Sequence, residues 1–326
     1  MRTATARPHC AAARPAPAAF IKSIGRPSHA RARSVTVRAE SAAAPLVLTG
    51  DIGGTNARLS IWQGVEELTS ETYPTSQFPE FEDAFEAFLE VSVLNDFEAV
   101  GYGVPALGPG DVVPLNPNAA PVAQAPKCVM GPGTGLGAAQ LFWDTGRGGY
   151  TVVPGEGAHA TFAPRGWRQQ ALAAWVTSRL GHCEIEEVAC GRGLELIYEF
   201  LISDDTRASA DGKPLAKLSA PEITARASEA DPLASEAVEI FLSVVGAEAG
   251  AMALRSLARG GVYIAGGIVP RLMERAGALR GAFLMPRGRE RFQGILQSIP
   301  LYVVTNTKVG IIGSREYALR SLAQRQ

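Results

Sequence analysis

The chain has 326 residues, of which 46% are hydrophobic and 19% are charged, and its formal net charge is -1. This balance is typical of a soluble globular protein of two domains. No apolar run approaches the roughly 20 residues that a membrane span requires, and the four cysteines lack both zinc-ligand spacing and a CxxC pair.

The first forty residues carry seven arginines and one lysine, and no acidic residue precedes Glu40. They are rich in Ala, Arg, Ser and Pro, a composition typical of organelle transit peptides. We therefore expect residues 1–43 to be a transit peptide and linker that direct the protein to the chloroplast stroma, with a mitochondrial presequence as the alternative. The remaining chain is acidic, so we expect no nucleic-acid partner.

The stretch from Leu46 to Trp62, LVLTGDIGGTNARLSIW, predicts a strand, a glycine turn and a second strand. Residues 71–74 predict a third strand. Glycines let the backbone approach a ligand closely, and successive N–H groups in such a turn can bind an anion. Asp51 ends the first strand, where it could hold a metal ion directly or through water. The turn suits a magnesium–nucleotide phosphate, although an ordinary tight turn has the same pattern.

Apolar residues recur with helical spacing over residues 78–90, which predicts an amphipathic helix. Residues 91–94 then predict a buried strand or strand end, with Asn95 and Asp96 at its tip and a helix over residues 99–104. A carboxylate at the carboxyl end of a strand is well placed for chemistry. An isolated Asn-Asp pair is nevertheless more often a helix cap.

Residues 127–143 repeat the opening pattern, with the turn Gly131-Pro132-Gly133-Thr134-Gly135-Leu136-Gly137 between two predicted strands. The repetition suggests an internal duplication. The spacing is not that of a Rossmann dinucleotide site, and no P-loop motif is present. The interpretation that remains is that the two glycine turns bind one polyphosphate between them, with an additional hydroxyl group from Thr134.

The loop Gly155-Glu156-Gly157-Ala158-His159 combines an acid and a histidine between glycines. Such a pair can bind the hydroxyl groups of a sugar, or provide two zinc ligands, although no further ligand is evident. The acids Glu184, Glu186 and Glu187 follow, and an acidic cluster of this kind is usually a solvated surface.

The second half also predicts four helices and two strands. The helices are expected over residues 167–180, 194–201 and 233–259 and from Arg315, and the strands over residues 261–270 and 300–305. Ser219 and Glu222 predict a capping box at the start of a further short helix. Gly266 and Gly267 form a third glycine site that could border a flat adenine or a ribose, although a plain strand-to-helix turn has the same pattern.

Together, these stretches resemble the bacterial-type glucokinase family of the hexokinase and actin-like ATPase superfamily. The resemblance rests on GDIGGTNARL, LNDFEAV, GPGTGLG, PGEGAH, GVYIAGGIVPR and IPLYVVT, which follow one another in the family's order. It implies an α/β, two-lobed actin-like ATPase (ribonuclease H-like) fold with mixed sheets flanked by helices. The implied domains are a small one at 44–107, completed by the C-terminal helix 307–326, and a large one at 108–306.

The resemblance also implies the site residues and the reaction. The ATP phosphates and adenosine would lie against Asp51, Gly53, Gly54, Thr55, Asn56, Gly133, Thr134, Gly135, Gly266 and Gly267. The glucose ligands would be Asn95, Asp96, Glu156, His159 and Glu186, with Asp96 as the catalytic base. The implied enzyme is an ATP-dependent hexose kinase that uses Mg²⁺, held by Asp51, and converts glucose to glucose 6-phosphate. Its partners would be glucose and ATP, with no membrane, and a homodimer is left open.

The sequence departs from the family pattern directly before Asn95. A stretch with two strands and a helix, which the family has there, is missing, so we expect an incomplete N-terminal lobe. The alternative function is therefore a catalytically impaired or inactive glucokinase-like protein that binds sugar or nucleotide, such as a sensor or a truncated isoform. A third interpretation, an actin-like or chaperone-like ATPase, leaves the Glu156 and His159 loop unexplained.

Overall fold

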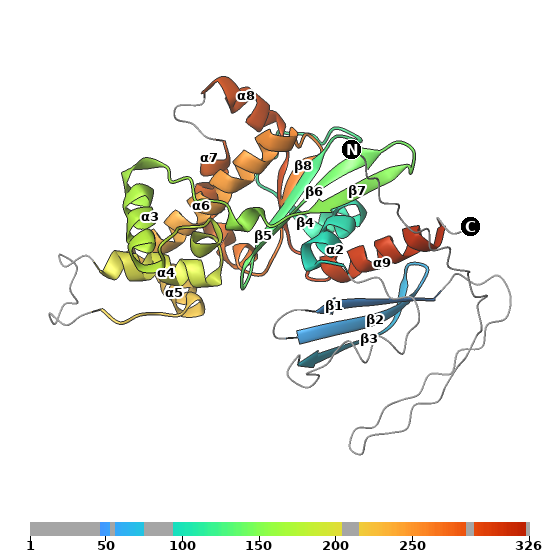
Figure 1. Ribbon diagram of the computed structural model, residues 1–326, viewed down its shortest axis with the longest axis horizontal. Coiled ribbons are helices and arrows are strands. Elements are labelled where there is room, and N and C mark those ends of the chain that lie inside the picture. Colours follow the sequence, from blue (N-terminus) through green and yellow to red (C-terminus); the bar gives the residue numbers. More distant parts are fainter. Residues whose placement is uncertain (1–45, 53–55, 75–93, 204–214, 285–289, 324–326) are drawn as a thin grey trace, which may run out of the picture. The chain divides into compact units, whose positions relative to one another are not determined.

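The computed structural model describes residues 46–52, 56–74, 94–203, 215–284 and 290–323, all within the second of the chain's two units, residues 44–326. The predicted transit peptide, the predicted helix over residues 78–90 and residues 91–93 of the predicted strand lie outside the described residues. The predicted boundary between domains at residue 107 stays a prediction. Element labels follow Figure 1.

A three-stranded antiparallel sheet contains β1 (Leu46–Ile52), β2 (Asn56–Gln63) and β3 (Glu66–Pro74), in that order (Figure 1). The predicted hairpin is thereby confirmed, and β3 begins earlier than predicted. The indole Nε1 of Trp62 donates a hydrogen bond of 3.1 Å to Oγ1 of Thr49, so the two polar groups satisfy each other inside the sheet's core.

A six-stranded mixed sheet has the order β4-β9-β8-β5-β6-β7. Its strands are β4 (Val112–Pro114), β5 (Lys127–Pro132), β6 (Leu136–Asp144), β7 (Gly149–Pro154), β8 (Gly261–Ile264) and β9 (Leu301–Val304). β8 runs parallel to β5 and β9, and the other neighbours are antiparallel. The second predicted hairpin, β5 to β6, is thereby confirmed.

Alternate side chains of a strand point to opposite faces of a sheet, and in the central strands the side chains on both faces are buried. Cys128 and Met130 of β5 belong to one core, whereas Val129 between them belongs to the other. Tyr263 of β8 and Tyr302 of β9 stack with ring centroids 5.1 Å apart on the same face as Val129. The sheet therefore separates two hydrophobic cores.

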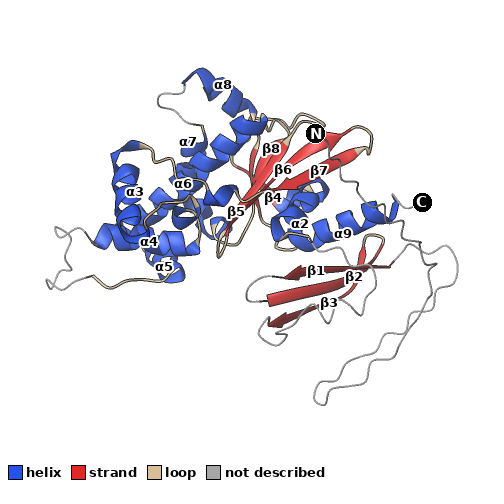
Figure 2. Ribbon diagram, viewed as in Figure 1, coloured by secondary structure: helices blue, strands red, loops and turns tan. Residues whose placement is uncertain are grey.

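Helices cover both faces of this sheet (Figure 2). One face carries α2 (Asp96–Gly103) and α9 (Val309–Ala323). The other carries α3 (Gly166–Leu180), α4 (Gly191–Ile202), α5 (Ala220–Ser228), α6 (Pro232–Ser256), α7 (Ala276–Phe283) and α8 (Glu290–Ser298). Of the described helices, α6 alone is long and apolar enough to cross a membrane, but 72% of its most apolar window is buried, as in a core helix.

Other predicted boundaries are also wrong, and the residues around two of them explain why. The strand expected over residues 261–270 ends at Ile264. Asn95 caps α2 through bonds to the N–H groups of Phe97 and Glu98, so the helix begins at Asp96 and not at Ala99. The helix expected from Arg315 already begins at Val309. Gly310 and Gly313 lie inside this helix, and at Gly313 α2 approaches so closely that a side chain would not fit.

Candidate active site

The turn between β5 and β6 is held in place by backbone hydrogen bonds. The N–H of Gly133 donates to the carbonyl of Gly135 at 2.8 Å, and the N–H of Gly191, the first residue of α4, donates to the carbonyl of Gly133 at 2.9 Å. Thr134 at the tip is exposed. The turn therefore presents a hydroxyl and a rigid backbone to solvent, as an anion-binding turn requires.

The turn between β1 and β2 is described only at its edges. Gly53, Gly54 and Thr55 lie outside the described residues, and Asn56 is the first residue of β2. Asp51 lies near the end of β1, opposite Arg58 of β2. Burial raises the pKa of the Asp51 carboxyl, the charge of Arg58 lowers it, and the charge of Asp96 raises it. Asp51 and Asp96 are therefore close enough to repel each other.

Asp96 is placed by the start of α2. Its Oδ1 accepts a hydrogen bond of 2.8 Å from the N–H of Phe97, and the side chain is exposed. The Phe97 ring covers the glycine hairpin: a Cβ on Gly137 would lie 1.8 Å from Cδ2 of Phe97, and a Cβ on Gly131 would lie 2.6 Å from its Cζ. The glycines of the hairpin therefore admit the ring that fixes Asp96 beside β6.

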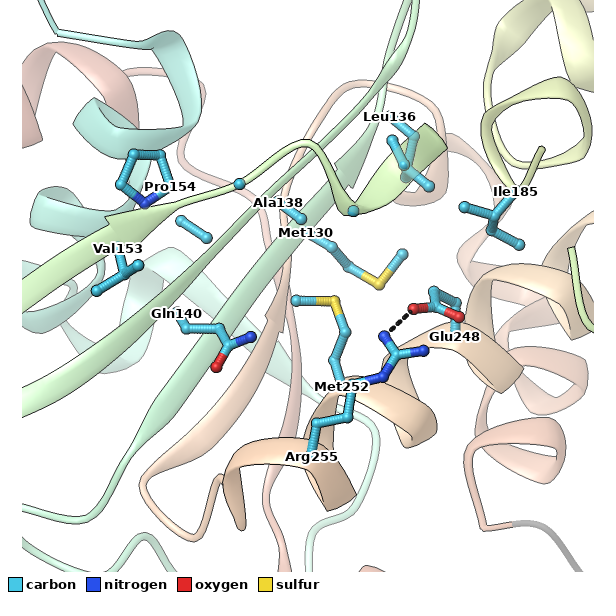
Figure 3. Close-up of a pocket in the computed structure, with 14 residues that line it drawn as sticks. Met130, Leu136, Ala138, Gln140, Val153, Pro154, Ile185, Glu248, Met252 and Arg255 are labelled. Atoms are coloured by element: carbon cyan, nitrogen blue, oxygen red, sulfur yellow. Dashed lines mark hydrogen bonds and ion pairs between the residues drawn. The ribbon is translucent and has the colours of Figure 1, made fainter. Parts of the chain in front are cut away.

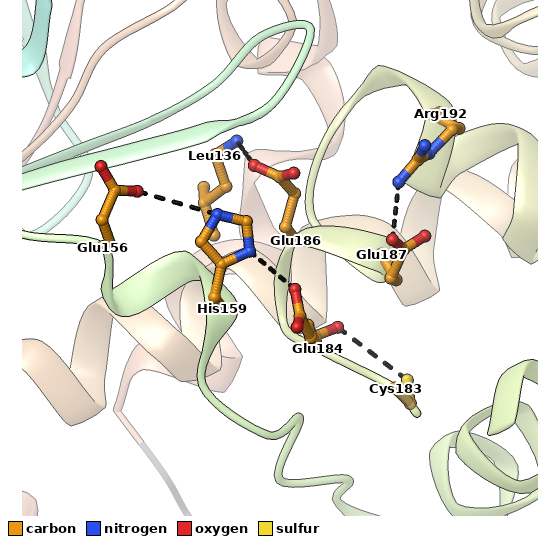
Figure 4. A network of polar contacts seen from close by, with 8 residues as sticks. All are labelled: Leu136, Glu156, His159, Cys183, Glu184, Glu186, Glu187 and Arg192. Atoms are coloured by element: carbon orange, nitrogen blue, oxygen red, sulfur yellow. Dashed lines mark hydrogen bonds and ion pairs between the residues drawn. The ribbon is translucent and has the colours of Figure 1, made fainter. Parts of the chain in front are cut away.

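The second acidic group lies on the loop after β7. His159 ends a short 3₁₀ helix (Gly157–His159), and its Nδ1 lies 2.7 Å from Oε2 of Glu184 (Figure 4). Its Nε2 lies 3.7 Å from Oε2 of Glu156. The hydrogen bond to Glu184 raises the pKa of the His159 imidazole, with smaller contributions of the same sign from Glu186 and Glu156. This part of the site is strongly acidic, and its carboxylates favour the protonated form of the histidine.

Glu186 and Glu187 are neighbours in sequence but have different surroundings. Oε2 of Glu186 accepts a hydrogen bond of 2.8 Å from the N–H of Leu136, directly after the second glycine turn (Figure 4). Glu187 instead pairs with Arg192 at 2.6 Å. Of the two acids, Glu186 is thus the one that contacts the second glycine hairpin, and its role as a sugar ligand stays a prediction.

These contacts connect most of the predicted sugar ligands to the second turn. Asp96 is followed by Phe97, whose ring packs on Gly137. The residue before Gly137 is Leu136, whose N–H donates a hydrogen bond to Glu186. Glu186 and Glu156 both act on the charge of His159. The site thus combines several carboxylates with a turn that is predicted to bind phosphate, which is the combination expected for transfer of a phosphoryl group to a polyhydroxylated acceptor.

The third glycine site borders the same hairpin. Gly266 follows β8 with a φ of 86°, and a Cβ there would lie 2.6 Å from the carbonyl oxygen of Pro132. Nothing lies within 4 Å of the position that a Cβ on Gly267 would take. The chain therefore leaves open space at Gly267, next to the turn that carries Thr134.

A cavity of about 120 Å³ lies behind the loop that carries Glu156. Met130 of β5 and Met252 of α6 line it, together with Gly155 and Gly157 of the loop, and the ion pair between Glu248 and Arg255 lies at its edge (Figure 3). The cavity adjoins the loop that carries Glu156, and none of the predicted ligands among the described residues lines it.

Sequence reasoning missed two residues of the site. Glu184 was considered only as one of three neighbouring acids, and nothing in the sequence shows that it contacts His159. Phe97 was not singled out, although Gly131 and Gly137 flank the predicted turn. Two glycines that face each other across neighbouring strands, as Gly131 and Gly137 do, indicate that a bulky group packs on the hairpin.

Known proteins match this chain over most of its length. The family model described as Glucokinase matches residues 48–93 and 87–321. A protein named Glucokinase from Synechocystis sp. is 38% identical over 256 residues, which cover 72% of this chain and 70% of that protein. Glucokinase from Yersinia pestis is 31% identical over 324 positions, which cover 84% of this chain and 97% of that protein.

Solved structures resemble the chain over most of its length. Glucokinase from an Antarctic psychrotroph matches with a TM-score of 0.69 and 24% identity, covering 84% of this chain and 98% of that one. A ROK family glucokinase from Streptomyces griseus, in complex with glucose and AMPPNP, matches with a TM-score of 0.57 and 17% identity, covering 85% and 100%. The predicted actin-like ATPase fold with mixed sheets flanked by helices is thereby confirmed.

Proposed function

The chain belongs to the Glucokinase family, and on that premise we propose that it transfers the γ-phosphoryl group of ATP to the 6-hydroxyl of glucose. The observation that carries the proposal is the bond between Glu186 and the N–H of Leu136, which brings a predicted sugar ligand to the predicted phosphate-binding turn. The similar Streptomyces protein was solved with glucose and AMPPNP, the two ligands that this reaction requires.

Asp96 acts as the general base in this proposal. It is exposed at the first turn of α2, and Asn95 fixes that turn by capping it. A carboxylate in reach of the 6-hydroxyl accepts its proton as the oxygen attacks the γ-phosphorus. The capped helix and the Phe97 ring keep Asp96 in one place, and such positioning is a large part of phosphoryl-transfer catalysis.

The remaining acids orient the sugar. Carboxylates of Glu156 and Glu186 accept hydrogen bonds from sugar hydroxyls, and His159 donates one. Each contact fixes the ring so that the 6-hydroxyl meets Asp96 and not solvent. Asn95 adds the amide of the helix cap as a further sugar ligand.

The two glycine turns would hold the phosphates, together with a magnesium ion bound by Asp51. Mg²⁺ is bound in such sites by one or two carboxylates together with phosphate oxygens. Asp51 fits this requirement, since it is a half-buried carboxylate near Asp96 with a raised pKa that a bound cation would lower. The metal would neutralise charge on the phosphates, and Thr134, Gly133 and Gly135 would hold them. Gly266 and Gly267 would border the adenosine.

A coupled assay for glucose 6-phosphate tests the proposal. We expect formation that depends on ATP, glucose and Mg²⁺ together, with Mg²⁺ removal by EDTA abolishing it. Glucose-dependent protection against thermal unfolding without any turnover would instead favour a sugar sensor. Turnover of ATP that is unaffected by glucose would favour an ATPase of another kind.

We also propose that the chain lacks a segment that its relatives have before Asn95. The two stretches matched by the family model overlap at residues 87–93. The alignment with the Yersinia protein runs over 324 positions but covers only 84% of this 326-residue chain, so that protein has residues without a counterpart here. Sequencing the transcript across the codons for residues 90–95 tests this, because an inserted exon would restore the segment.

Finally, we propose that residues 1–43 direct the protein to the chloroplast stroma. The absence of acids before Glu40 and the eight basic residues support this location. A fusion of residues 1–43 to a fluorescent protein should enter plastids in leaf cells. Accumulation of the fusion in mitochondria would favour the alternative.

A further inference from the structure

His159 lies between two carboxylates that approach its two ring nitrogens. Nδ1 is 2.7 Å from Oε2 of Glu184, and Nε2 is 3.7 Å from Oε2 of Glu156 (Figure 4). The first contact is a short hydrogen bond, and the second is too long for one. A ligand hydroxyl that hydrogen-bonds to both Nε2 and the Glu156 carboxylate could therefore bridge these two groups.

The backbone fixes the position of Glu184. Glu184 and Thr161 form an antiparallel bridge, the N–H of Ile185 donates to the carbonyl of Ala160 at 2.9 Å, and the N–H of Phe162 donates to the carbonyl of Cys183 at 2.9 Å. The segment with Glu184 is thus joined to the residues that follow His159. The carboxylate reaches the imidazole from a rigid support and not from a free surface loop.

We propose that Glu184 is a positioning residue that keeps His159 doubly protonated, so that its Nε2–H group donates to a glucose hydroxyl that in turn donates to Glu156. The inference rests on the proposed function and deepens it. Glu184 acts through His159 and does not touch the sugar.

The hydrogen-bonding roles of the imidazole support the protonated form. In a neutral ring that donates from Nδ1 to Glu184, Nε2 is only an acceptor. It would then face Glu156, another acceptor, with no proton between them. In the imidazolium both nitrogens donate, and a sugar hydroxyl can accept from Nε2–H and donate to Glu156.

The electrostatic surroundings favour the same form. The charged groups that act on His159 are Glu156 on its own loop, and Glu184 and Glu186 on the segment joined to it, and all three are acidic. The hydrogen bond to Glu184 makes the largest contribution to the raised pKa of the imidazole. Removing that carboxylate should therefore lower the pKa more than any other single change around the ring.

The first test measures the KM for glucose as a function of pH, between about pH 6 and pH 9. KM of the wild-type enzyme should be constant at low pH and rise once the imidazolium loses its proton. In Glu184→Gln the rise should begin at lower pH while kcat stays near the wild-type value. A displacement of one pH unit corresponds to about a tenfold higher KM above both pKa values. Coincident KM profiles of the two enzymes would overturn the inference.

Two further variants separate charge from position. Glu184→Asp keeps the charge but shortens the side chain, so it should restore most of the pH profile while raising KM at every pH. Glu199→Gln is the matched control, because Glu199 pairs with Lys217 in an exposed ion pair and faces no part of the site. Its profile should equal that of the wild type.

A second readout does not depend on activity. The imidazole of His159 can be titrated by NMR in isotopically labelled protein, with the signal assigned by its loss in His159→Gln. Its pKa should lie above the ordinary histidine value in the wild type and fall in Glu184→Gln. An ordinary pKa in the wild-type titration overturns the inference even if Glu184→Gln does not fold. A wild-type protein without turnover would instead refute the proposed function, and the titration would still report on the pair.

Discussion

The ring of Phe97 occupies the space in which a side chain on Gly137 would have to lie. A Cβ added to Gly137 would be 1.8 Å from Cδ2 of the ring and 2.4 Å from its Cγ. The ring therefore locks the first turn of α2, with Asp96 on it, onto the hairpin whose turn is the predicted phosphate site. One glycine thus sets the distance between the proposed base and the proposed phosphates.

Gly137→Ala should therefore impair both folding and catalysis. The ring must move or the hairpin must shift, which typically costs about 1–3 kcal/mol of unfolding free energy. Because Asp96 moves with Phe97, kcat should fall by more than the loss of folded protein explains. Denaturant unfolding and the coupled assay measure the two effects.

The matched control is Gly281→Ala. Gly281 is exposed on α7, and nothing lies within 4 Å of its Cβ position. Alanine has the higher helix propensity, so this variant should be as stable as the wild type or slightly more stable. Equal behaviour of the two alanine variants would mean that the contact between Phe97 and Gly137 does not matter.

Asp96→Asn should abolish turnover and leave sugar binding largely intact. The amide cannot accept the proton of the 6-hydroxyl, and loss of a general base typically lowers kcat by about 10²- to 10⁴-fold. Asparagine has nearly the same shape, and its oxygen can still accept from the N–H of Phe97. Isothermal titration with glucose and the coupled assay separate the two effects, and undiminished kcat would refute the role of Asp96.

Glu186→Gln and Glu187→Gln should have opposite consequences although the residues are neighbours. Glu186 faces the turn through the N–H of Leu136, so its variant should raise the KM for glucose by about 10- to 100-fold, as expected for a hydrogen bond to a charged group. Glu187 pairs with Arg192, so its variant should change the melting temperature and leave KM unchanged. The reverse pattern would show that the two acids have been assigned in the wrong register.

Asp51→Asn should stabilise the ligand-free protein while it lowers activity. Burial, opposed by Arg58 and aided by Asp96, raises the pKa of Asp51, so the folded state holds this proton more tightly than the unfolded chain does. The contribution of Asp51 to stability is therefore favourable below the ordinary carboxyl pKa and falls as pH rises through the raised pKa. The asparagine variant should melt at a higher temperature near pH 7, and this gain should shrink towards acidic pH.

In the same variant the loss of the proposed magnesium ligand should lower kcat by about a hundredfold, and more Mg²⁺ should be needed for half-maximal rate. Calorimetry at several pH values and Mg²⁺ titrations of the rate measure the two parts. A lower melting temperature at neutral pH would contradict the assigned effect of burial on Asp51.

The sequence was sufficient for the elements whose periodicity or turn chemistry is local. Both glycine hairpins, α3 and the core helix α6 lie where their patterns predict. The capping box of Ser219 and Glu222 also forms, because all of its partners lie within one turn.

The rest depended on residues far apart in the chain. Glycine usually disfavours a helix, but Gly310 and Gly313 lie inside α9. At Gly313 the reason is the contact with α2, since a Cβ there would lie 1.6 Å from the carbonyl oxygen of Ala99. The partnership of His159 with Glu184 is likewise set by a bridge between two loops. Secondary-structure propensity depends on residues that are close in sequence, so it cannot predict contacts between segments that are far apart in the chain.

The packing of α9 also has a consequence for biosynthesis. Ile311 of this last helix completes the small core that contains Val47 and Trp62 from the first described strands. A nascent chain exposes those side chains until the residues of α9 have been synthesised and have left the ribosomal exit tunnel. The first sheet therefore stays uncovered until α9 emerges, and a premature stop codon before α9 would leave the earliest strands without their cover and send the product to proteolysis.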